Sequence, residues 1–253
     1  MNAAAGFTTA DHAYMTRALR LARRGVYTTH PNPRVGCVLV HDGQVVGEGW
    51  HRLAGEPHAE ILALRDAGDA ARGATAFVTL EPCAHHGRTP PCAPALIEAG
   101  IRRVVVPAAD PNPRVAGKGL ALLREAGVRV DVGLLADEAE RLNVGFNQRM
   151  TAGRPRVTVK LAASLDGRTA MASGESQWIT GPAARADVQR LRAASSAIMT
   201  GIGTGLADDP SLNVRAAEID MAGRQPQRVV LDSRLRLPPD ARLLGLPGQT
   251  LVM

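Results

Sequence analysis

The stretch that decides the fold runs from residue 58 to residue 108, "HAEILALRDAGDAARGATAFVTLEPCAHHGRTPPCAPALIEAGIRRVVVPA". Two runs rich in β-branched residues alternate in it with two runs of helical spacing, and Gly68 and Gly100 end the helical runs. We therefore expect strands at 74–80 and 101–108 and helices at 58–68 and 93–100. Strands that alternate with helices of this length indicate an α/β sheet with mostly parallel strands.

The same alternation continues on both sides of this stretch. Two β-branched runs around Asp42-Gly43 predict a hairpin over 35–50, because Asp-Gly is a strong signal for a two-residue turn. The remaining elements expected in the first half are helices at 11–25, 119–127 and 135–150 and a strand at 128–133.

A Gly-Arg-Pro break at 153–155 separates this half from a second one. We place the boundary near residues 150 to 155, which gives one domain at 1–150 and another at 151–253. The second half is expected to hold strands at 157–161, 196–201, 228–232 and 249–253, a helix at 182–193 and a Gly-rich turn at 201–205.

Composition limits the class of protein. A length of 253 residues suits two domains, and 45% hydrophobic with 21% charged residues is typical of a soluble globular protein. The N-terminus lacks the basic start and apolar core of a secretory signal, and no apolar run has membrane-spanning length, so we expect a cytoplasmic protein. Three cysteines, an odd number, argue against a disulfide framework and favour ligands or nucleophiles.

The net charge of +6 raises the question of nucleic-acid binding. The basic residues are scattered, all but Lys118 and Lys160 are arginine, and aromatic residues make up only 3% of the chain, too few for a base-stacking platform. We expect no nucleic-acid partner and no membrane partner. A small phosphorylated substrate needs only one or two of these charges.

Three residues form a candidate zinc site. His58 opens a predicted helix, Cys83 follows the end of the next strand, and Cys92 lies beyond a proline-rich loop. One imidazole and two thiolates give three ligands and leave a fourth tetrahedral position for water, which is the catalytic rather than the structural arrangement. Zinc lowers the pKa of bound water to about 7, and Glu60, close to the metal without binding it, can carry the proton.

Hydroxide that attacks a carbon bearing an exocyclic amino group gives hydrolytic deamination of an aminopyrimidine or purine. The pattern His-x-Glu followed by Pro-Cys-x-x-Cys is the signature of zinc deaminases. This sequence matches "HAE" at 58–60 and "PC" at 82–83, but eight residues separate Cys83 from Cys92 instead of two.

The long inter-cysteine loop belongs to a wider resemblance. The segments "THPNPRVGCVLV", "GEPHAEILAL", "VTLEPCAHHGRTPPC" and "DPNPRVAGKGL" together resemble the riboflavin-biosynthesis deaminase over nearly all of residues 11 to 150. In the second half, "KLAASLDGRTAMASGESQWIT" and "GIGTGLADDPSLNVR" resemble the reductase domain fused to that deaminase in bacteria.

The resemblance implies a fold and a two-step activity. The fold is a cytidine-deaminase-like α/β/α sandwich followed by a partial dihydrofolate-reductase-like α/β domain. The implied activity is zinc-dependent deamination of 2,5-diamino-6-ribosylamino-4(3H)-pyrimidinone 5′-phosphate, then NADPH-dependent reduction of the ribosyl side chain to ribityl. A homo-oligomer is expected from the same resemblance.

The resemblance also implies site residues. In the deaminase half, one set would contact the pyrimidine and the ribosyl phosphate: Asn32, His51, Arg88, Asp110 and Asn112. In the reductase half, one set would hold NADPH (Ala162, Trp178, Thr204, Asp208 and Ser233) and another the phosphorylated substrate (Ser176, Arg192, Leu212 and Arg215). His85 and His86 are expected to be loop or substrate-side residues, since a fourth protein ligand would close the metal site.

The second half is expected to be incomplete. "TLVM" at 250–253 is typical of the opening of a buried strand, and about 100 residues with about four strands are few for a closed α/β domain. The later reductase segment of the family, an acidic residue followed by a Gly-rich stretch, has no counterpart before Met253. We therefore expect hydride transfer by the intact protein but not necessarily by this chain.

Two other functions remain open at this point. One is a cytidine or tRNA-adenosine deaminase with an unrelated partner domain, against which the eight-residue cysteine spacing and the second-half motifs count. The other is a zinc-stabilised binding module for RNA, which predicts RNA affinity with a steep salt dependence and no release of ammonia.

Overall fold

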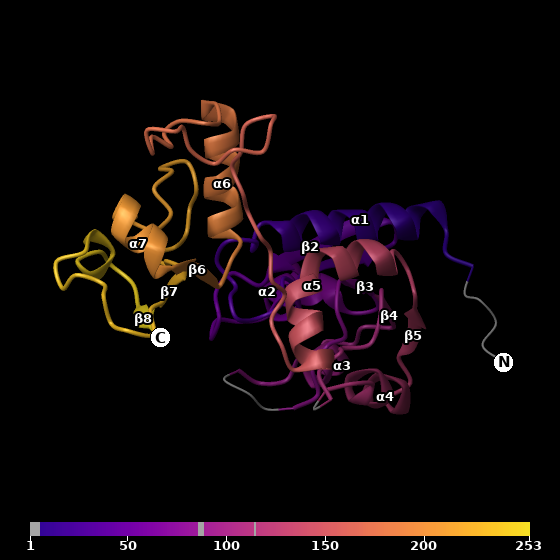
Figure 1. Cartoon of the computed structure of the whole chain (residues 1–253). Helices are drawn as coiled ribbons and strands as arrows, with labels where there is room; N and C mark the ends of the chain where they lie inside the picture. Colours follow the sequence, from indigo (N-terminus) through magenta and orange to yellow (C-terminus); the bar gives the residue numbers. More distant parts are fainter. Residues whose placement is uncertain (1–5, 86–88, 114) are drawn as a thin grey trace. The chain divides into compact units, whose positions relative to one another are not determined.

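The computed structural model describes residues 6–85, 89–113 and 115–253. It divides into two compact units, one ending at Arg156 and the other beginning at Val157, each with its own sheet (Figure 1). None of the helices in these described ranges is long and apolar enough to cross a membrane.

The first unit is built on a five-stranded sheet with the order β2-β1-β3-β4-β5. Strands β3, β4 and β5 are parallel, as the alternation of strands and helices predicts, whereas β1 pairs antiparallel with both β2 and β3. The strands are β1 (Gly36–His41), β2 (Gln44–Trp50), β3 (Thr75–Val78), β4 (Arg103–Val106) and β5 (Arg129–Val132).

The predicted hairpin over 35–50 is confirmed as the β1–β2 pair. Asp42 and Gly43 form its turn with φ values of 48° and 75°. Positive φ at both central positions is the geometry of a type I′ turn, and it explains why Asp-Gly stands there.

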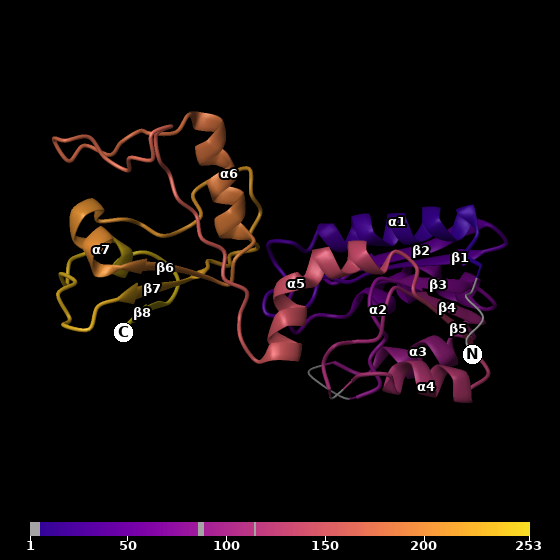
Figure 2. The same cartoon turned by 45° about the vertical axis from the view of Figure 1, so that its right-hand side comes forward.

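Helices cover both faces of this sheet, which confirms the expected α/β/α sandwich (Figure 2). Alternate residues of β1 point to opposite faces: Cys37 and Leu39 pack with α2, α3 and α4, while Val38 and Val40 pack with α1 and α5. The helices are α1 (Thr9–Arg23), α2 (Ala59–Ala67), η1 (Gly68–Ala71), α3 (Cys92–Glu98), α4 (Lys118–Glu125) and α5 (Ala136–Ala152).

The start of α1 is fixed to the sheet. Thr8 and Asp11 form a reciprocal capping box, and the Asp11 carboxylate also accepts a 2.7 Å hydrogen bond from Arg103 on β4. Burial by itself would raise the pKa of Asp11, but the hydrogen bonds from Arg103 and Thr8 outweigh it and hold that pKa below its ordinary value. One carboxylate thus caps a helix and joins it to a central strand.

The second unit has a three-stranded parallel sheet with the order β6-β7-β8. Leu212, Val230 and Leu243 form its small buried core. The predicted helix at 182–193 and three of the four predicted strands are confirmed. The elements are α6 (Pro182–Ala193), β6 (Ala197–Gly201), α7 (Ile202–Asp208), β7 (Gln227–Leu231), η2 (Arg242–Leu244) and β8 (Thr250–Val252).

The strand predicted at 157–161 is wrong for this structure. The segment has no regular secondary structure, and Val157, Val159 and Leu161 are 75–79% exposed. Alternating apolar residues predict a strand, but a strand also needs a neighbour to accept its backbone hydrogen bonds. No described strand of the second unit pairs with this segment.

The Gly-rich turn predicted at 201–205 is also wrong. Gly201 is the N-cap of α7, with φ −86° and ψ 159°, and the helix runs on through Gly203 and Gly205. Glycine lowers helix propensity by about 1 kcal/mol relative to alanine, so the sequence favours a turn. In the structure, α7 nevertheless begins at Ile202, directly after the last residue of β6.

Candidate metal centre and the cavity beside it

Close packing of α2 on the hairpin places His58. His58 is the N-cap of α2, and its side chain makes no capping hydrogen bond. A Cβ atom on Gly49 of β2 would lie 2.3 Å from the carbonyl oxygen of Ala59 and 2.7 Å from the backbone nitrogen of Ala63. Only glycine at this position lets the first turn of α2 lie this close to the strand.

The two cysteines reach the same place from the other side. Cys83 lies in the segment that leaves β3, and Cys92 is the first residue of α3, with Pro91 as its N-cap. The backbone N–H of Cys92 donates to Cys83 Sγ over 3.4 Å. The start of α3 therefore directs a backbone donor at the sulfur of Cys83.

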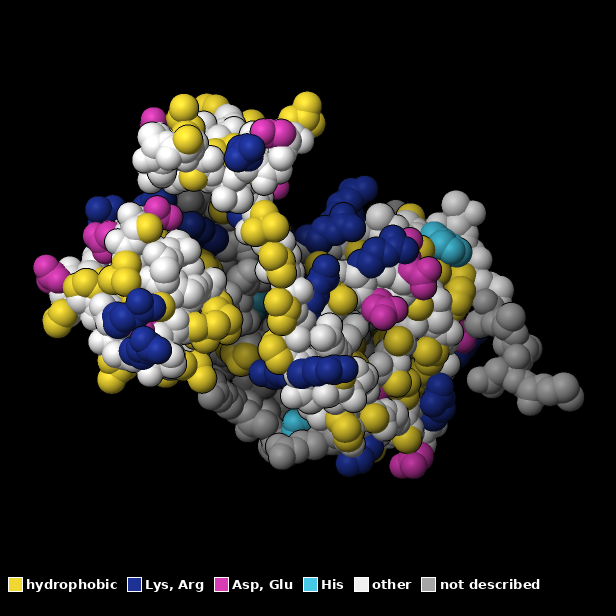
Figure 3. All heavy atoms as spheres, viewed as in Figure 1, with side chains coloured by type: hydrophobic (Ala, Val, Ile, Leu, Met, Phe, Trp, Pro, Cys, Tyr) yellow, Lys and Arg dark blue, Asp and Glu magenta, His cyan; other side chains and the backbone are white. Residues whose placement is uncertain are grey.

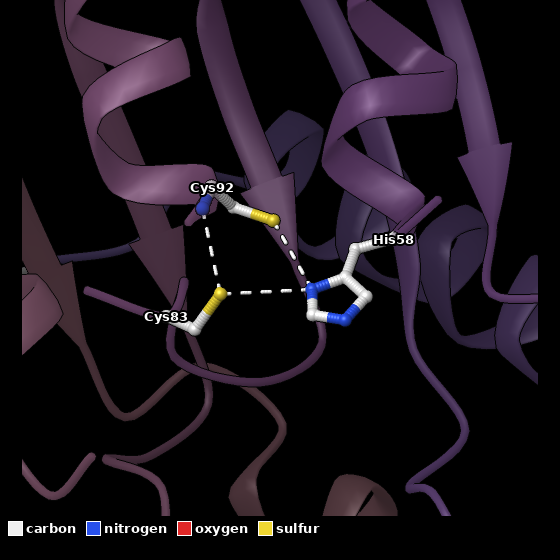
Figure 4. A group of neighbouring side chains, drawn as sticks. All are labelled: His58, Cys83 and Cys92. Atoms are coloured by element: carbon white, nitrogen blue, oxygen red, sulfur yellow. Dashed lines mark hydrogen bonds between the residues drawn. The ribbon is translucent and has the colours of Figure 1, made fainter. Parts of the chain in front are cut away.

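The predicted ligand set comes together in the structure. His58 Nδ1 lies 3.2 Å from Cys92 Sγ and 3.6 Å from Cys83 Sγ, and the imidazole points between the two sulfurs (Figure 4). All three ligand atoms lie within 4.8 Å of one another. Thr89 Oγ1 lies 3.3 Å from the other ring nitrogen, Nε2.

These positions fit a tetrahedral zinc ion. Ligands at about 2.0–2.3 Å from one zinc ion and at tetrahedral angles are about 3.5 Å apart. The distances between the imidazole nitrogen and the sulfurs bracket this value. Among the described residues the group has three members, one fewer than tetrahedral coordination requires.

The charge state of the thiols fits a metal centre. Hydrogen bonding from Cys92, helped by His58, lowers the pKa of Cys83 to about 4, so Cys83 is a thiolate at neutral pH. A hydrogen bond to that thiolate, and then burial, raises the pKa of Cys92, and the negative charge of Cys83 also opposes a second thiolate beside it. A divalent cation removes this conflict, because it binds both sulfurs as thiolates.

Glu60 lies on the first turn of α2 and is 3% exposed. Burial raises its pKa to about 7 in the absence of a metal ion. A carboxyl group whose pKa lies near neutrality can both accept and donate a proton during turnover.

A cavity of about 540 Å³ opens beside these residues. It brings together two of the three ligands, Glu60 and most of the predicted substrate residues. Two further groups line it that the sequence did not indicate: the end of α5 with Phe146, Arg149 and Met150, and the buried carboxylate of Glu81. The sequence-predicted residues that line it are Asn32, His51, His58, Glu60, Cys83, Asp110 and Asn112.

Hydrogen bonds fix the tautomer of His51. Its Nδ1 lies 3.3 Å from the carbonyl oxygen of Pro57, which can only accept, so Nδ1 carries the proton. Nε2 then accepts from the Asn32 amide over 3.0 Å. Burial lowers the pKa of His51, which keeps the ring neutral.

Asp110 and Asn112 form one turn on the wall of the cavity. The Asp110 carboxylate accepts from the backbone N–H of Asn112 over 2.8 Å. Burial raises the pKa of Asp110 to about 6. His85 is exposed and also lines the cavity, whereas Arg88 and His86 lie outside the described residues.

Asn143 connects two segments that line the cavity, a role that the sequence did not predict. Its amide exchanges two hydrogen bonds with the backbone of Arg34, and α5 departs from helical geometry at this residue. The "PNPR" segment that carries Asn32 is thereby joined to the helix that carries Phe146. The partners are 109 residues apart, so no local pattern signals the contact.

In the second unit, the structure brings two of the predicted substrate residues together. Arg192 donates to the backbone carbonyl of Asn213 over 3.0 Å, and Arg215 donates to its side chain over 3.1 Å. Burial, and then the charge of Arg215, lowers the pKa of Arg192. Two guanidinium groups that share one asparagine form a positively charged pair.

The other predicted residues of this unit are more dispersed. Leu212 has its side chain in the core, and Trp178 is 69% exposed with the Arg185 guanidinium 4.5 Å from the centre of its ring. Thr204 and Asp208 lie on α7, and Ser233 follows β7. Ala162 and Ser176 lie in the irregular segment before α6.

The fold and the site define a zinc-dependent deaminase domain followed by a second α/β domain. Comparison with known families agrees. Residues 8–108 match the cytidine and deoxycytidylate deaminase zinc-binding region, and residues 155–253 match the RibD C-terminal domain.

Relatives match nearly the whole chain. The riboflavin biosynthesis protein RibD of Escherichia coli K12 is 60% identical over 95% of this chain and 68% of its own length. The Acinetobacter baumannii RibD structure is 57% identical, with a TM-score of 0.92 over 96% of this chain and 69% of that one. The Thermotoga maritima diaminohydroxyphosphoribosylaminopyrimidine deaminase/5-amino-6-(5-phosphoribosylamino)uracil reductase is 41% identical, with a TM-score of 0.89 over the same shares.

The chain therefore belongs to the RibD family, the bifunctional deaminase/reductases of riboflavin biosynthesis. The resemblance, the two-part fold and the enzyme class read from the sequence are confirmed. Zinc in the deaminase domain and NADPH in the reductase domain are the cofactors of this family. The chain spans about two thirds of the length of these relatives.

Proposed function

We propose that the first unit hydrolyses the 2-amino group of 2,5-diamino-6-ribosylamino-4(3H)-pyrimidinone 5′-phosphate. The observation that carries the proposal is that the buried carboxyl group of Glu60 lines the same cavity as the ligands His58 and Cys83, beside the third ligand Cys92. Three ligands and a separate acid/base group are what a hydrolytic zinc site needs.

In this proposal a bound zinc ion supplies an activated water molecule at neutral pH. Glu60 accepts the proton of that water as its oxygen bonds to the carbon that bears the amino group. Glu60 then delivers that proton to the ring nitrogen. It next takes the proton of the newly bound hydroxyl group and passes it to the amino group, which leaves as ammonia. The carbon–nitrogen bond breaks, a carbonyl forms, and the carboxylate returns to its starting state.

The walls of the cavity would orient the substrate. The amide of Asn32, which the neutral ring of His51 positions, suits the donors and acceptors of a pyrimidinone edge. Asp110 and Asn112 would hold the ribosyl phosphate moiety. Arg88 is proposed for the phosphate, because a guanidinium binds phosphate oxygens through two parallel hydrogen bonds.

Ammonia release from this pyrimidinone phosphate tests the proposal. We expect Glu60→Gln to keep its zinc and to lose at least about 100-fold in rate, since general acid–base catalysis contributes that much. Glu98→Gln, an exposed change on α3, is the control and should match the wild type. A zinc-loaded Glu60→Gln variant with full activity would show that Glu60 is not the proton carrier.

For the second unit we propose NADPH-dependent reduction of the ribosyl group in a protein of the relatives' full length. The Arg192–Arg215 pair supports it, since two adjacent guanidinium groups suit a substrate phosphate. The other residues proposed are Ser176 and Leu212 for the substrate and Ala162, Trp178, Thr204, Asp208 and Ser233 for the nucleotide. NADPH oxidation with the deaminated substrate, measured on a protein of the relatives' full length, tests the proposal, and an absence of turnover would contradict it.

The partner proposed is a small phosphorylated pyrimidine, and the protein is proposed to act in the cytoplasm as a homo-oligomer. On the face drawn in Figure 3, Lys and Arg side chains lie in several separate groups with apolar and acidic side chains among them, which does not favour an RNA-binding stripe. Ammonia release from free cytidine or tRNA would favour the alternative deaminase instead. Light scattering after gel filtration measures the oligomeric state.

A further inference from the structure

The buried carboxylate of Glu81 lies between the metal-binding segment and the Asp110–Asn112 turn. Glu81 is 3% exposed and stands two residues before the ligand Cys83. It follows β3, and the Asp110–Asn112 turn follows β4. Because β3 and β4 are parallel neighbours, the segments that follow them leave the same edge of the sheet.

Four backbone donors converge on this carboxylate. Oε2 accepts from the N–H groups of Asp110 over 2.8 Å and Gly117 over 2.9 Å. Oε1 accepts from Gly119 over 2.9 Å and from Leu120 over 3.3 Å. The four donors span the loop after β4 and the first turn of α4, so one side chain fixes both ends of that loop.

A close backbone contact shows how tightly the two segments pack. A Cβ atom on Gly119 would lie 1.8 Å from the carbonyl oxygen of Pro82. Pro82 joins Glu81 to Cys83, so the start of α4 packs directly on the chain that carries the metal ligand. The hydrogen bonds and this contact hold both ends of the loop against the segment that carries Cys83.

We propose that Glu81 is a positioning residue for substrate binding. It sets the Asp110–Asn112 turn at a fixed place relative to the segment that holds Cys83, and it acts through that turn rather than by contact with the reacting atoms. The inference rests on the proposed deaminase function, because the turn is the proposed binding site of the ribosyl phosphate moiety.

Glu81→Gln tests the proposal. The glutamine amide nitrogen cannot accept a hydrogen bond, so one pair of the four backbone donors loses its acceptor. We expect the zinc content to stay at one equivalent, KM for the pyrimidinone phosphate to rise about tenfold and kcat to change less than about threefold, the pattern of lost uniform binding. Glu98→Gln, on the exposed side of α3, is the matched control.

A double-mutant cycle separates positioning from mere stability. If Glu81 acts through the turn, adding Glu81→Gln to Asn112→Ala raises KM little further. If Glu81 has an independent structural role, the KM increases of the two single variants multiply in the double variant. An unchanged KM, multiplied effects, or a fall in kcat or zinc content without a change in KM would overturn the proposal. Should Glu81→Gln not fold, Glu81→Asp keeps the charge on a shorter side chain, and the same readouts decide.

The wild type separates this inference from the proposed function. A wild-type protein that releases no ammonia from the pyrimidinone phosphate refutes the deaminase proposal itself. With an active wild type, the KM, kcat and zinc content of the Glu81 variants decide the role of Glu81 alone.

Discussion

Single side chains at the metal centre combine chemistry with a cost in stability. Glu60 is almost completely buried, and burial raises its pKa from 4.5 to about 7. In the unfolded chain the same carboxyl ionises near its ordinary pKa. Between these two values the folded protein holds a proton that the unfolded chain has released, so the free energy of unfolding falls as pH rises.

The first prediction follows from that shift. In metal-free protein the decrease in the free energy of unfolding is complete above about pH 7 and amounts to about 3 kcal/mol. Glu60→Gln does not titrate, so we expect the metal-free variant to be more stable than the metal-free wild type at pH 8 and close to it at pH 4.5. Urea unfolding with a chelator present measures both, with Glu98→Gln as control. Equal stability of wild type and variant at pH 8 would contradict a pKa of Glu60 that burial raises.

The second prediction concerns Thr89. Its hydroxyl lies 3.3 Å from Nε2 of His58, so it holds the imidazole with Nδ1 toward the sulfurs. Loss of such an outer partner typically costs 10–100-fold in metal affinity. We expect Thr89→Val, which keeps the shape, to lower zinc affinity by about 10-fold and Thr89→Ser to retain it. Competition with a chromophoric chelator is the measurement, and equal affinities would show that the hydroxyl has no such role.

At the scale of elements, close packing of α2 on β2 brings His58 and Glu60 to the cavity. The position of His58 depends on the distance between β2 and α2. Gly49 sets that distance, since a Cβ there meets the backbone of α2 at 2.3 Å.

The third prediction is that Gly49→Ala displaces the start of α2. We expect a loss of about 1–3 kcal/mol in stability, the range for overpacking a tight contact, and weaker zinc binding. Gly145→Ala on α5 is the control, because nothing lies within 4 Å of a Cβ at that position. Thermal unfolding and chelator competition measure the two effects, and a Gly49→Ala variant with unchanged zinc affinity would show that α2 accommodates the methyl group.

At the scale of the whole molecule, all described ligands of the metal centre belong to the first unit. Metal binding stabilises only the structure that forms the site, by an amount that grows with the ratio of free metal to its dissociation constant. The second unit has its own sheet and its own small core around Val230.

The fourth prediction is that zinc removal affects the two units differently. We expect hydrogen exchange after chelation to accelerate in α2 and α3 and to stay unchanged in β6 and β7. Mass spectrometry of peptides from the two units reads both in one sample, and restoring zinc is the control. Equal acceleration in both units would show that the second unit depends on the metal centre for its stability.

Local patterns were sufficient for most of the fold. The alternation of strands and helices, the Asp42-Gly43 turn and the glycines that end helices depend on neighbours in the sequence, so they could be predicted. The segment at 157–161 alternates apolar and polar residues as β5 does, yet it forms no strand here. A strand exists only with a hydrogen-bonding partner, and the sequence does not say which partner is present.

By itself, the sequence determined the family and predicted the candidate ligands and the proposed acid/base group, because His58, Glu60, Cys83 and Cys92 stand in a motif whose chemistry follows from residue type and order. Only the tertiary structure decided what surrounds them. The four donors on Glu81 come from 29 to 39 residues away, and the partner of Asn143 is 109 residues away. Contacts of this kind depend on which segments the sheet brings to one edge, and no local spacing encodes them.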